Sequence, residues 1–304
     1  MSFGSPHDVV DCDAEARRLD ELLTFVTQRR IMTVSDDSGW GKSTFLRKLH
    51  HLCRWRHGVP VALVPLEDYE DRPDEFALVT DLVAQLKESE LRFPSFDELT
   101  LARSFHDVAM FANNVHGTAN ANGAVINESI IAGTMYKIEN VEQFNRFGAP
   151  DWTDEADRQA KLLCVEAFFT ELLDAARKSP LVIMFDTVES AHEKLKDWLF
   201  LALVKRRVLA DPDGHKLVIV LAGKKLEADL RSRFLDYDSF FESILSLGIW
   251  DLEDTARLFE VRGFDKLLPE DVHYLHAVIV SRNMSLIDVL AIADIINKKR
   301  IAGK

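Results

Sequence analysis

Four nearly continuous apolar runs are spaced along the first three quarters of the chain. They are 31–34 (IMTV), 59–66 (VPVALVPL), 181–185 (LVIMF) and 216–223 (KLVIVLAG). Runs without polar alternation are typical of strands that are buried on both faces, as in a parallel sheet. We therefore expect these segments to be strands of one sheet.

Amphipathic stretches separate the runs. Apolar residues recur at helical spacing in 13–29, 45–53, 73–86, 153–178 and 199–207. Strands that alternate with helices imply right-handed crossovers, and hence a doubly wound α/β sheet. Beyond about residue 245 the pattern is helical only, with breaks at Gly263 and Pro269.

This pattern divides the chain into an α/β domain, residues 1–244, and a small α-helical lid domain, residues 245–304. The alternation is interrupted by an insertion at about 95–150. Within it, 113–127 is rich in Asn, Gly and Ala without an apolar period, and 129–144 favours a β-hairpin. The insertion is either a surface excursion or a docking or regulatory element, and its sequence does not choose between them.

The segment 31–49 (IMTVSDDSGWGKSTFLRKL) joins the first run to a helix through a loop with two glycines. This is the pattern of a phosphate-binding loop, in which backbone N–H groups and a helix N-terminus face the anion. Lys42 would reach the β- and γ-phosphates, and the Ser43 hydroxyl would bind Mg²⁺. The expected nucleotide-binding residues are Ser38, Gly39, Trp40, Gly41, Lys42, Ser43 and Thr44.

One position departs from the G-x-x-x-x-G-K-[ST] pattern, because Asp36 stands where the first glycine is expected. A carboxylate beside a polyphosphate is repulsive, and Asp adopts a positive φ less readily than Gly. A plain turn between strand and helix is the alternative interpretation. The strand before the loop and the helix after it favour the phosphate loop.

Two further runs end in polar residues, at the sheet edge where doubly wound sheets bind ligands. Asp186 follows the third run and would hold Mg²⁺. Glu189, just beyond, would polarise an attacking water, and Lys224 would sense the γ-phosphate or stabilise its developing charge. The alternatives are that Asp186 is a helix N-cap and Glu189 a solvated acid.

The chain of 304 residues carries a formal net charge of −13. Such an acidic balance disfavours sequence-independent binding to nucleic acid, although a local basic patch would permit it. The N-terminus has no apolar signal core, and no run approaches the length of a membrane span.

The chain has three cysteines, Cys12, Cys53 and Cys164, without a C-x-x-C pair. A sparse, odd set predicts reduced thiols in a cytoplasmic protein. His50, Cys53 and His57 would share one helix face, which raises a metal site as an alternative. We favour Cys53 as a small core residue instead.

Four segments resemble the STAND class of P-loop NTPases, the AAA+-related signalling ATPases that include NACHT and NB-ARC proteins. They are 38–46 (SGWGKSTFL), 183–190 (IMFDTVES), 217–225 (LVIVLAGKK) and 244–264 (ILSLGIWDLEDTARLFEVRGF). The resemblance implies a nucleotide-gated switch, held closed by ADP and opened by ATP, often with self-oligomerisation. Such switches are slow ATPases that act through a protein partner or effector.

Several positions depart from this family. Cys12 stands where many relatives carry an Arg, Asp36 replaces a glycine, and Lys224 stands where Arg is common. The stretch 281–285 lacks the Gly-x-Pro of the family's lid. These departures indicate weak hydrolysis, or binding without turnover.

The sequence is therefore consistent with three alternative functions. The first is a STAND-like ATP switch with Mg²⁺, acting in signalling or defence. The second is a degenerate P-loop protein that serves as an interaction scaffold. The third is a DNA-acting AAA+ protein of origin-recognition type, for which 205–207 (KRR) and 224–225 (KK) are the hints. The preference for ATP over GTP comes from the resemblance.

Overall fold

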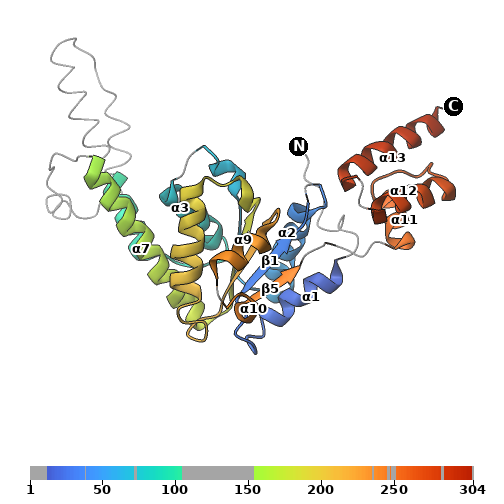
Figure 1. The fold of residues 1–304 in the computed structure, drawn as a ribbon. Helices are drawn as coiled ribbons and strands as arrows, with labels where there is room; N and C mark the ends of the chain where they lie inside the picture. Colours follow the sequence, from blue (N-terminus) through green and yellow to red (C-terminus); the bar gives the residue numbers. More distant parts are fainter. Residues whose placement is uncertain are drawn as a thin grey trace, which may run out of the picture. The chain divides into compact units, whose positions relative to one another are not determined.

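The computed structural model describes residues 12–37, 39–71, 74–104, 154–234, 236–244, 247, 251–281 and 284–302. The chain forms two compact units. One comprises Met1–Arg92 together with Leu172–Lys304, and the other comprises Phe93–Glu171. Figure 1 shows the elements of each.

The larger unit is built on a five-stranded sheet with the order β2-β3-β4-β1-β5, in which all neighbouring strands are parallel. The strands are β1 (Ile31–Ser35), β2 (Val61–Pro65), β3 (Leu181–Asp186), β4 (Leu217–Gly223) and β5 (Phe241–Ile244). Ser35 pairs with Gly223 and Pro65 with Asp186, so the strands end at one common edge. This confirms the expected α/β fold with a parallel sheet.

Strand β5 was not expected from the sequence. Its end residues, Phe241 and Ile244, are buried, and the two between them are half-buried. One of these two, Glu242, forms ion pairs with Arg18 and Arg29. Strand β5 therefore lacks the continuous apolar run that indicates the other four strands, and the sequence pattern does not predict it.

Helices α1 (Asp13–Leu22) and α2 (Lys42–His51) cover one face of the sheet (Figure 1). A π-helical segment, η2 (Leu52–His57), continues α2. Alternate strand residues join these helices in one buried cluster, namely Met32, Val34, Val182, Met184, Val218 and Val220. Period-two packing of this kind follows from the pleat of the strands.

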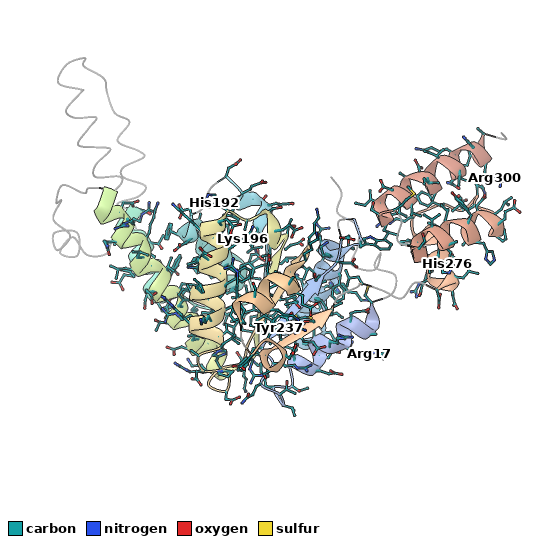
Figure 2. All side chains as sticks on the ribbon, in the orientation of Figure 1. Arg17, His192, Lys196, Tyr237, His276 and Arg300 are labelled. Carbon is teal, nitrogen blue, oxygen red and sulfur yellow. The ribbon has the colours of Figure 1, made fainter. Side chains whose placement is uncertain are left out.

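The remaining elements of the α/β part are η3 (Leu66–Tyr69), α3 (Glu75–Lys87), η4 (Val188–Ser190), α8 (Glu193–Asp197), η5 (Trp198–Val208), α9 (Leu226–Arg233) and α10 (Tyr237–Phe240). Three buried or half-buried hydroxyls join α10 to the sheet. Tyr237 (labelled in Figure 2) hydrogen-bonds to Thr33 of β1 at 3.1 Å and to Ser243 of β5 at 2.7 Å. Their mutual bonds offset the cost of burying them.

Three helices complete this unit: α11 (Leu252–Val261), α12 (Pro269–Ser281) and α13 (Leu286–Ile301). We call them the lid helices. Asp251 and Asp254 form a capping box at the start of α11. Gly263, with φ of 76°, follows the end of α11, and Pro269 begins α12, as the sequence pattern predicts. Among the described residues, no helix combines the length and the apolar character that a membrane span requires.

The smaller unit contains a helix over 94–104 and the first part of α7 (Asp154–Lys178). The Glu171 carboxylate accepts hydrogen bonds from the backbone N–H groups of Ser95 at 2.7 Å and Phe96 at 3.2 Å. Near them, Phe93 and Phe168 stack with their ring centroids 5.8 Å apart. Most of the insertion expected at 95–150, including the predicted hairpin at 129–144, lies outside the described residues.

Candidate functional site

The loop between β1 and α2 turns on two glycines. Gly39 and Gly41 have φ of 82° and 87°, values that favour residues without a Cβ. Gly41 is the N-cap of α2, so the first N–H groups of that helix face the loop. A Cβ on Gly41 would meet nothing within 4 Å, which shows that its backbone angle, and not space, calls for glycine. Of the expected nucleotide-binding residues, Ser38 lies outside the described residues.

The Lys42 side chain folds back beneath this loop. It is only 8% exposed, and its Nζ donates to the backbone carbonyls of Asp36 at 2.6 Å and Asp37 at 2.7 Å. An ammonium has three N–H donors. The two carbonyls use two of them within the described residues, which leaves the third for a ligand. Burial lowers the pKa of Lys42, while the negative charges of Glu189, Asp36 and Asp186 act in the opposite direction.

Asp186 lies at the end of β3 and is 7% exposed. Its Oδ1 accepts the Thr187 N–H at 2.9 Å. In the part of the chain that the structure describes, neither Asp186 Oδ2 nor the Ser43 hydroxyl has a hydrogen-bond partner. Carboxylate and hydroxyl oxygens are the ligands that Mg²⁺ prefers, so this donor set fits that ion. The N-cap alternative for Asp186 fails, since the N-cap of η4 is Thr187.

Glu189 is bound to the end of the neighbouring strand. Its Oε2 accepts the backbone N–H of Lys224 at 3.0 Å. A Cβ added to Gly223 would lie 2.7 Å from the same oxygen. The carboxylate is therefore fixed against β4 and is not the freely solvated acid that the alternative interpretation proposed.

Several of the predicted site residues belong to elements that begin or end at this edge of the sheet. Glu189 and Asp186 act electrostatically on the ammonium of Lys42, and the positive charge of the exposed Lys224 acts on it in the opposite sense. Thr44 follows Ser43 in the first turn of α2 and is half-buried there.

Asp36 has a role that the loop pattern does not show. Its Oδ1 accepts the Asp37 N–H at 2.8 Å, and its Oδ2 accepts the backbone N–H of Leu247 at 2.9 Å. Its backbone does not have the positive φ that a glycine position would suggest. The carboxylate thus binds the segment that leads from β5 toward the lid helices.

The Trp40 side chain packs against the lid helices. Its indole is 5% exposed and belongs to the hydrophobic cluster of the lid helices. The other buried members are Leu258, Phe259, Leu275, Ile279, Val289 and Ala293. Beside it, a Cβ on Gly39 would lie 2.8 Å from the Cβ of Ser285. Only the backbone of Trp40 remains to serve a nucleotide, and the sequence analysis missed its contact with the lid.

Two residues of the alternative metal site on α2 and η2, Cys53 and His57, have other surroundings in the structure. Cys53 is fully buried in the core beneath α2, and burial raises the pKa of its thiol to about 12. His57 Nε2 is 2.8 Å from the Asp20 carboxylate. Among the described residues, no group of three His, Cys, Asp or Glu side chains is arranged to hold a metal.

Comparisons with known proteins add distant structural neighbours only. No protein-family model and no curated protein matches the sequence. A solved chain of the E. coli MS115-1 HORMA:CdnC:Trip13 complex aligns at 11% identity over 91% of this chain and 78% of that one, with a TM-score of 0.42. The Aeropyrum pernix ORC2 protein, solved as ADPNP–ADP complexes, aligns at 14% identity over 87% of this chain and 54% of that one, with a TM-score of 0.41. Likeness at this level does not bear on function.

Proposed function

We propose that this chain is a nucleotide-binding molecular switch that holds ATP or ADP with Mg²⁺ in the β1–α2 loop. The observation that carries the proposal is the convergence of Lys42, Asp186 and Glu189 at one sheet edge, next to a glycine loop that begins a helix. Nothing in the packing of the core requires three ionisable side chains there. Such clusters are characteristic of functional sites.

Each residue has a separate task in this proposal. The loop N–H groups, the N-terminus of α2 and the third donor of Lys42 bind the phosphates. Ser43 and Asp186 hold Mg²⁺, which neutralises charge on the β- and γ-phosphate oxygens when it is bound. Lys224, exposed at the end of β4, adds positive charge near the terminal phosphate.

Hydrolysis is slow or absent in this proposal. Glu189 is the candidate for polarising a water, but its Oε2 accepts the Lys224 N–H and its rotation is limited by β4. The oxygen engaged in this way cannot at the same time accept a proton from water. Turnover therefore has to use the second carboxylate oxygen or requires that this hydrogen bond be released, which suits a switch better than a fast ATPase.

The switch itself is the position of the lid helices. The phosphate loop contacts them directly through Trp40, and it contacts the segment that precedes them through Asp36. A ligand that changes the shape of this loop changes the free energy of both contacts, and lid movement changes nucleotide affinity by the same amount. The resemblance to STAND ATPases supports an output through a protein partner, in signalling or defence, by self-association or through an effector.

Calorimetric titration with Mg²⁺–ATP and Mg²⁺–ADP tests the nucleotide part. We expect saturable binding by the wild type and its loss in Lys42→Ala. The matched control is Lys178→Ala, which removes an exposed lysine from the end of α7. Equal binding by Lys42→Ala and the wild type would refute the site. Absence of binding by the folded wild type would favour the interaction scaffold instead.

A further inference from the structure

The segment that holds the phosphate loop, α2, η2 and β2 has basic residues and no acidic ones. Residues 38–66 contain no Asp or Glu, although the whole chain has 50 such residues and a net charge of −13. The segment contains five Lys and Arg residues and three His. Lys42 serves the nucleotide site, while the others lie farther along α2 and η2 and have no part in it. An acidic protein repels polyanions in general, so a local exception to its charge indicates a surface with its own ligand.

Within this segment an aromatic ring is left in solvent. Trp55 is 71% exposed, on the π-helical segment η2. The guanidinium of Arg54 lies 5.6 Å from the centre of its ring, and the His51 ring centre lies 6.4 Å away. Exposing a large apolar side chain forgoes the free energy of burying it, and short π-helical segments are frequent at functional sites.

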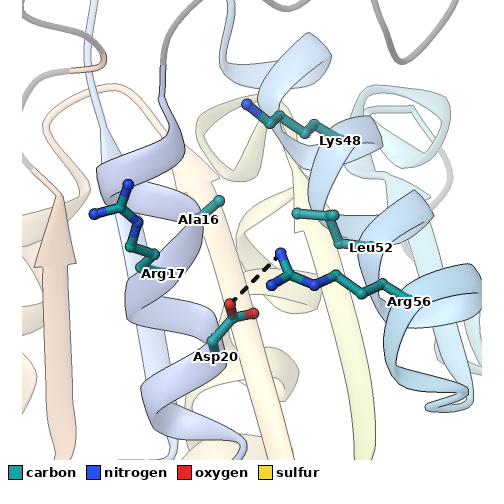
Figure 3. A pocket seen from close by; sticks show the side chains of 6 residues that line it. All are labelled: Ala16, Arg17, Asp20, Lys48, Leu52 and Arg56. Carbon is teal, nitrogen blue, oxygen red and sulfur yellow. Dashed lines mark ion pairs between the residues drawn. The ribbon is translucent and has the colours of Figure 1, made fainter.

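A cavity of about 380 Å³ lies on the same helix pair (Figure 3). Ala16, Arg17 and Asp20 of α1 line it on one side, and Lys48, Leu52 and Arg56 of α2 and η2 line it on the other. Figure 3 shows that Arg56 points toward Asp20, and their charged atoms are 4.0 Å apart. Figure 2 shows Arg17 at the surface of the molecule. The lining thus carries three cations and one carboxylate, and of the three cations Arg56 points toward Asp20 in Figure 3.

Acidic neighbours reduce this positive charge without cancelling it. Asp20 is shared between Arg56 and His57, and Glu88 accepts a hydrogen bond from Arg54 at 3.0 Å. Asp20 lies within the cavity lining and Glu88 outside it, and each is paired with at least one cation. Arg17 has no ion pair among the described residues. The balance favours a ligand that carries several negative charges.

We propose that this basic surface, made of Arg17, Lys48, Arg54, Trp55 and Arg56, binds single-stranded nucleic acid. Arg17, Lys48 and Arg56 contact phosphates, and a base stacks on the exposed face of Trp55. A single strand offers both groups at once, because its bases are unstacked, whereas a duplex hides the faces of its bases. An acidic peptide would use the cations but gains less from an exposed indole, and it is the alternative that the experiment separates.

Fluorescence anisotropy with a 15-nucleotide, fluorescein-labelled oligo-dT tests this surface on the full chain. We expect saturable binding whose association constant falls with salt, with a log–log slope of about −2 for three phosphate contacts. Trp55→Ala should weaken binding about tenfold, and Trp55→Phe should restore most of it. Arg17→Gln with Lys48→Gln should make the slope about 1.4 less steep.

The control is Lys178→Gln with Lys216→Gln, which removes the same charge from two exposed residues, one at the end of α7 and one just before β4. It should bind like the wild type, and thermal melting should show all variants folded. Four outcomes overturn the proposal: no binding, equal binding of a 15-base-pair duplex, tighter binding of a labelled poly-glutamate peptide, or loss of binding in this control alone. Nucleotide binding at Lys42 is measured separately and does not depend on the result.

Discussion

The backbone N–H of Lys224 donates a 3.0 Å hydrogen bond to the carboxylate of Glu189, which joins the turn after β3 to the end of β4. The contact is possible because residue 223 is a glycine, since a Cβ there would lie 2.7 Å from Glu189 Oε2. One small residue therefore determines where the candidate catalytic carboxylate lies. The glycine is needed for this close approach and not for its backbone angle, which lies outside the left-handed region.

Gly223→Ala should destabilise the protein by about 1–3 kcal/mol, because the new methyl group forces Glu189 off its position. The same change in a Glu189→Ala background should cost clearly less, because the next nearest atom, the Cβ of Val188, is 3.5 Å away and makes an ordinary contact. Urea unfolding of the four proteins in this double-mutant cycle measures the coupling. Equal costs in both backgrounds would show that Glu189 is not the obstacle.

Asp36→Gly restores the glycine of the phosphate-loop pattern, yet we expect it to be harmful. It leaves the backbone N–H groups of Asp37 and Leu247 without their acceptor, at a cost of about 1–3 kcal/mol in unfolding free energy. Asp37→Gly removes the same charge from the adjacent exposed residue and is the control. A stable Asp36→Gly protein would contradict the structural role of this carboxylate.

The sheet and the charged residues at its edge could be predicted from the sequence for one physical reason. Strands buried on both faces must be apolar throughout, so the strands ending at Ser35, Asp186 and Gly223 are visible as runs, and the residues that follow mark the sheet edge. Edge strand β5 (Phe241–Ile244) buries only its first and last residues and gives no such signal.

The contacts of the phosphate loop could not be predicted, because their partners are remote. Asp36 binds a residue 211 positions along the chain, and no local pattern encodes that pairing. Trp40 is conspicuous as a large aromatic residue between two glycines. Its destination, the cluster around Phe259 and Ile279, depends on how three helices fold together. A phosphate-loop pattern predicts the shape of the backbone and does not predict what the Trp40 side chain packs against.

Stability should decrease as the pH falls below 6.5, in part through His215. Its Nδ1 accepts the Leu217 N–H, so Nε2 carries the proton and donates to the Val208 carbonyl. Burial lowers the pKa of His215, against the opposing effect of its carbonyl partners. Above pH 6.5 the imidazole is neutral in both states. Below it, the unfolded chain binds a proton that the folded chain does not, so the free energy of unfolding falls.

Urea unfolding at several values between pH 7.5 and pH 5 measures this dependence. His215→Gln should show a shallower decline than the wild type, because Gln does not titrate. Part of the decline should remain, since burial also lowers the pKa of His50. An unchanged slope in the variant would mean that His215 takes up its proton in the folded state as readily as in the unfolded chain.

The three cysteines should be unreactive in the folded protein. All three are buried, and burial raises the pKa of Cys53 to about 12 and also raises that of Cys164. Thiolates, which are the reactive form, are therefore scarce at pH 8. Ellman's reagent should react slowly with the native chain and rapidly with three thiols after unfolding in guanidinium. Rapid reaction of a native thiol would disprove the placement of that cysteine.

Trp40 should transmit nucleotide binding to the lid helices. Its indole fills the cluster between α11, α12 and α13 while its backbone belongs to the phosphate loop, so one residue takes part in both structures. Trp40→Ala leaves a cavity in that cluster, and large-to-small changes of this size cost about 3–5 kcal/mol where the site does not collapse. The loss of stability should be concentrated in the lid helices. Hydrogen-exchange protection should therefore weaken more over 252–301 than over strands β1 to β4.

Hydrogen exchange followed by mass spectrometry, with and without Mg²⁺–ATP, separates coupling from simple loosening. In the wild type, nucleotide should change the protection of the lid helices. In Trp40→Ala that change should vanish even where calorimetry shows that the loop still binds nucleotide. Tyr274→Ala removes an aromatic side chain that is exposed on α12 and should leave the response intact. A lid that responds to nucleotide without Trp40 would show that coupling passes by another route, with Asp36 and Leu247 the remaining contact.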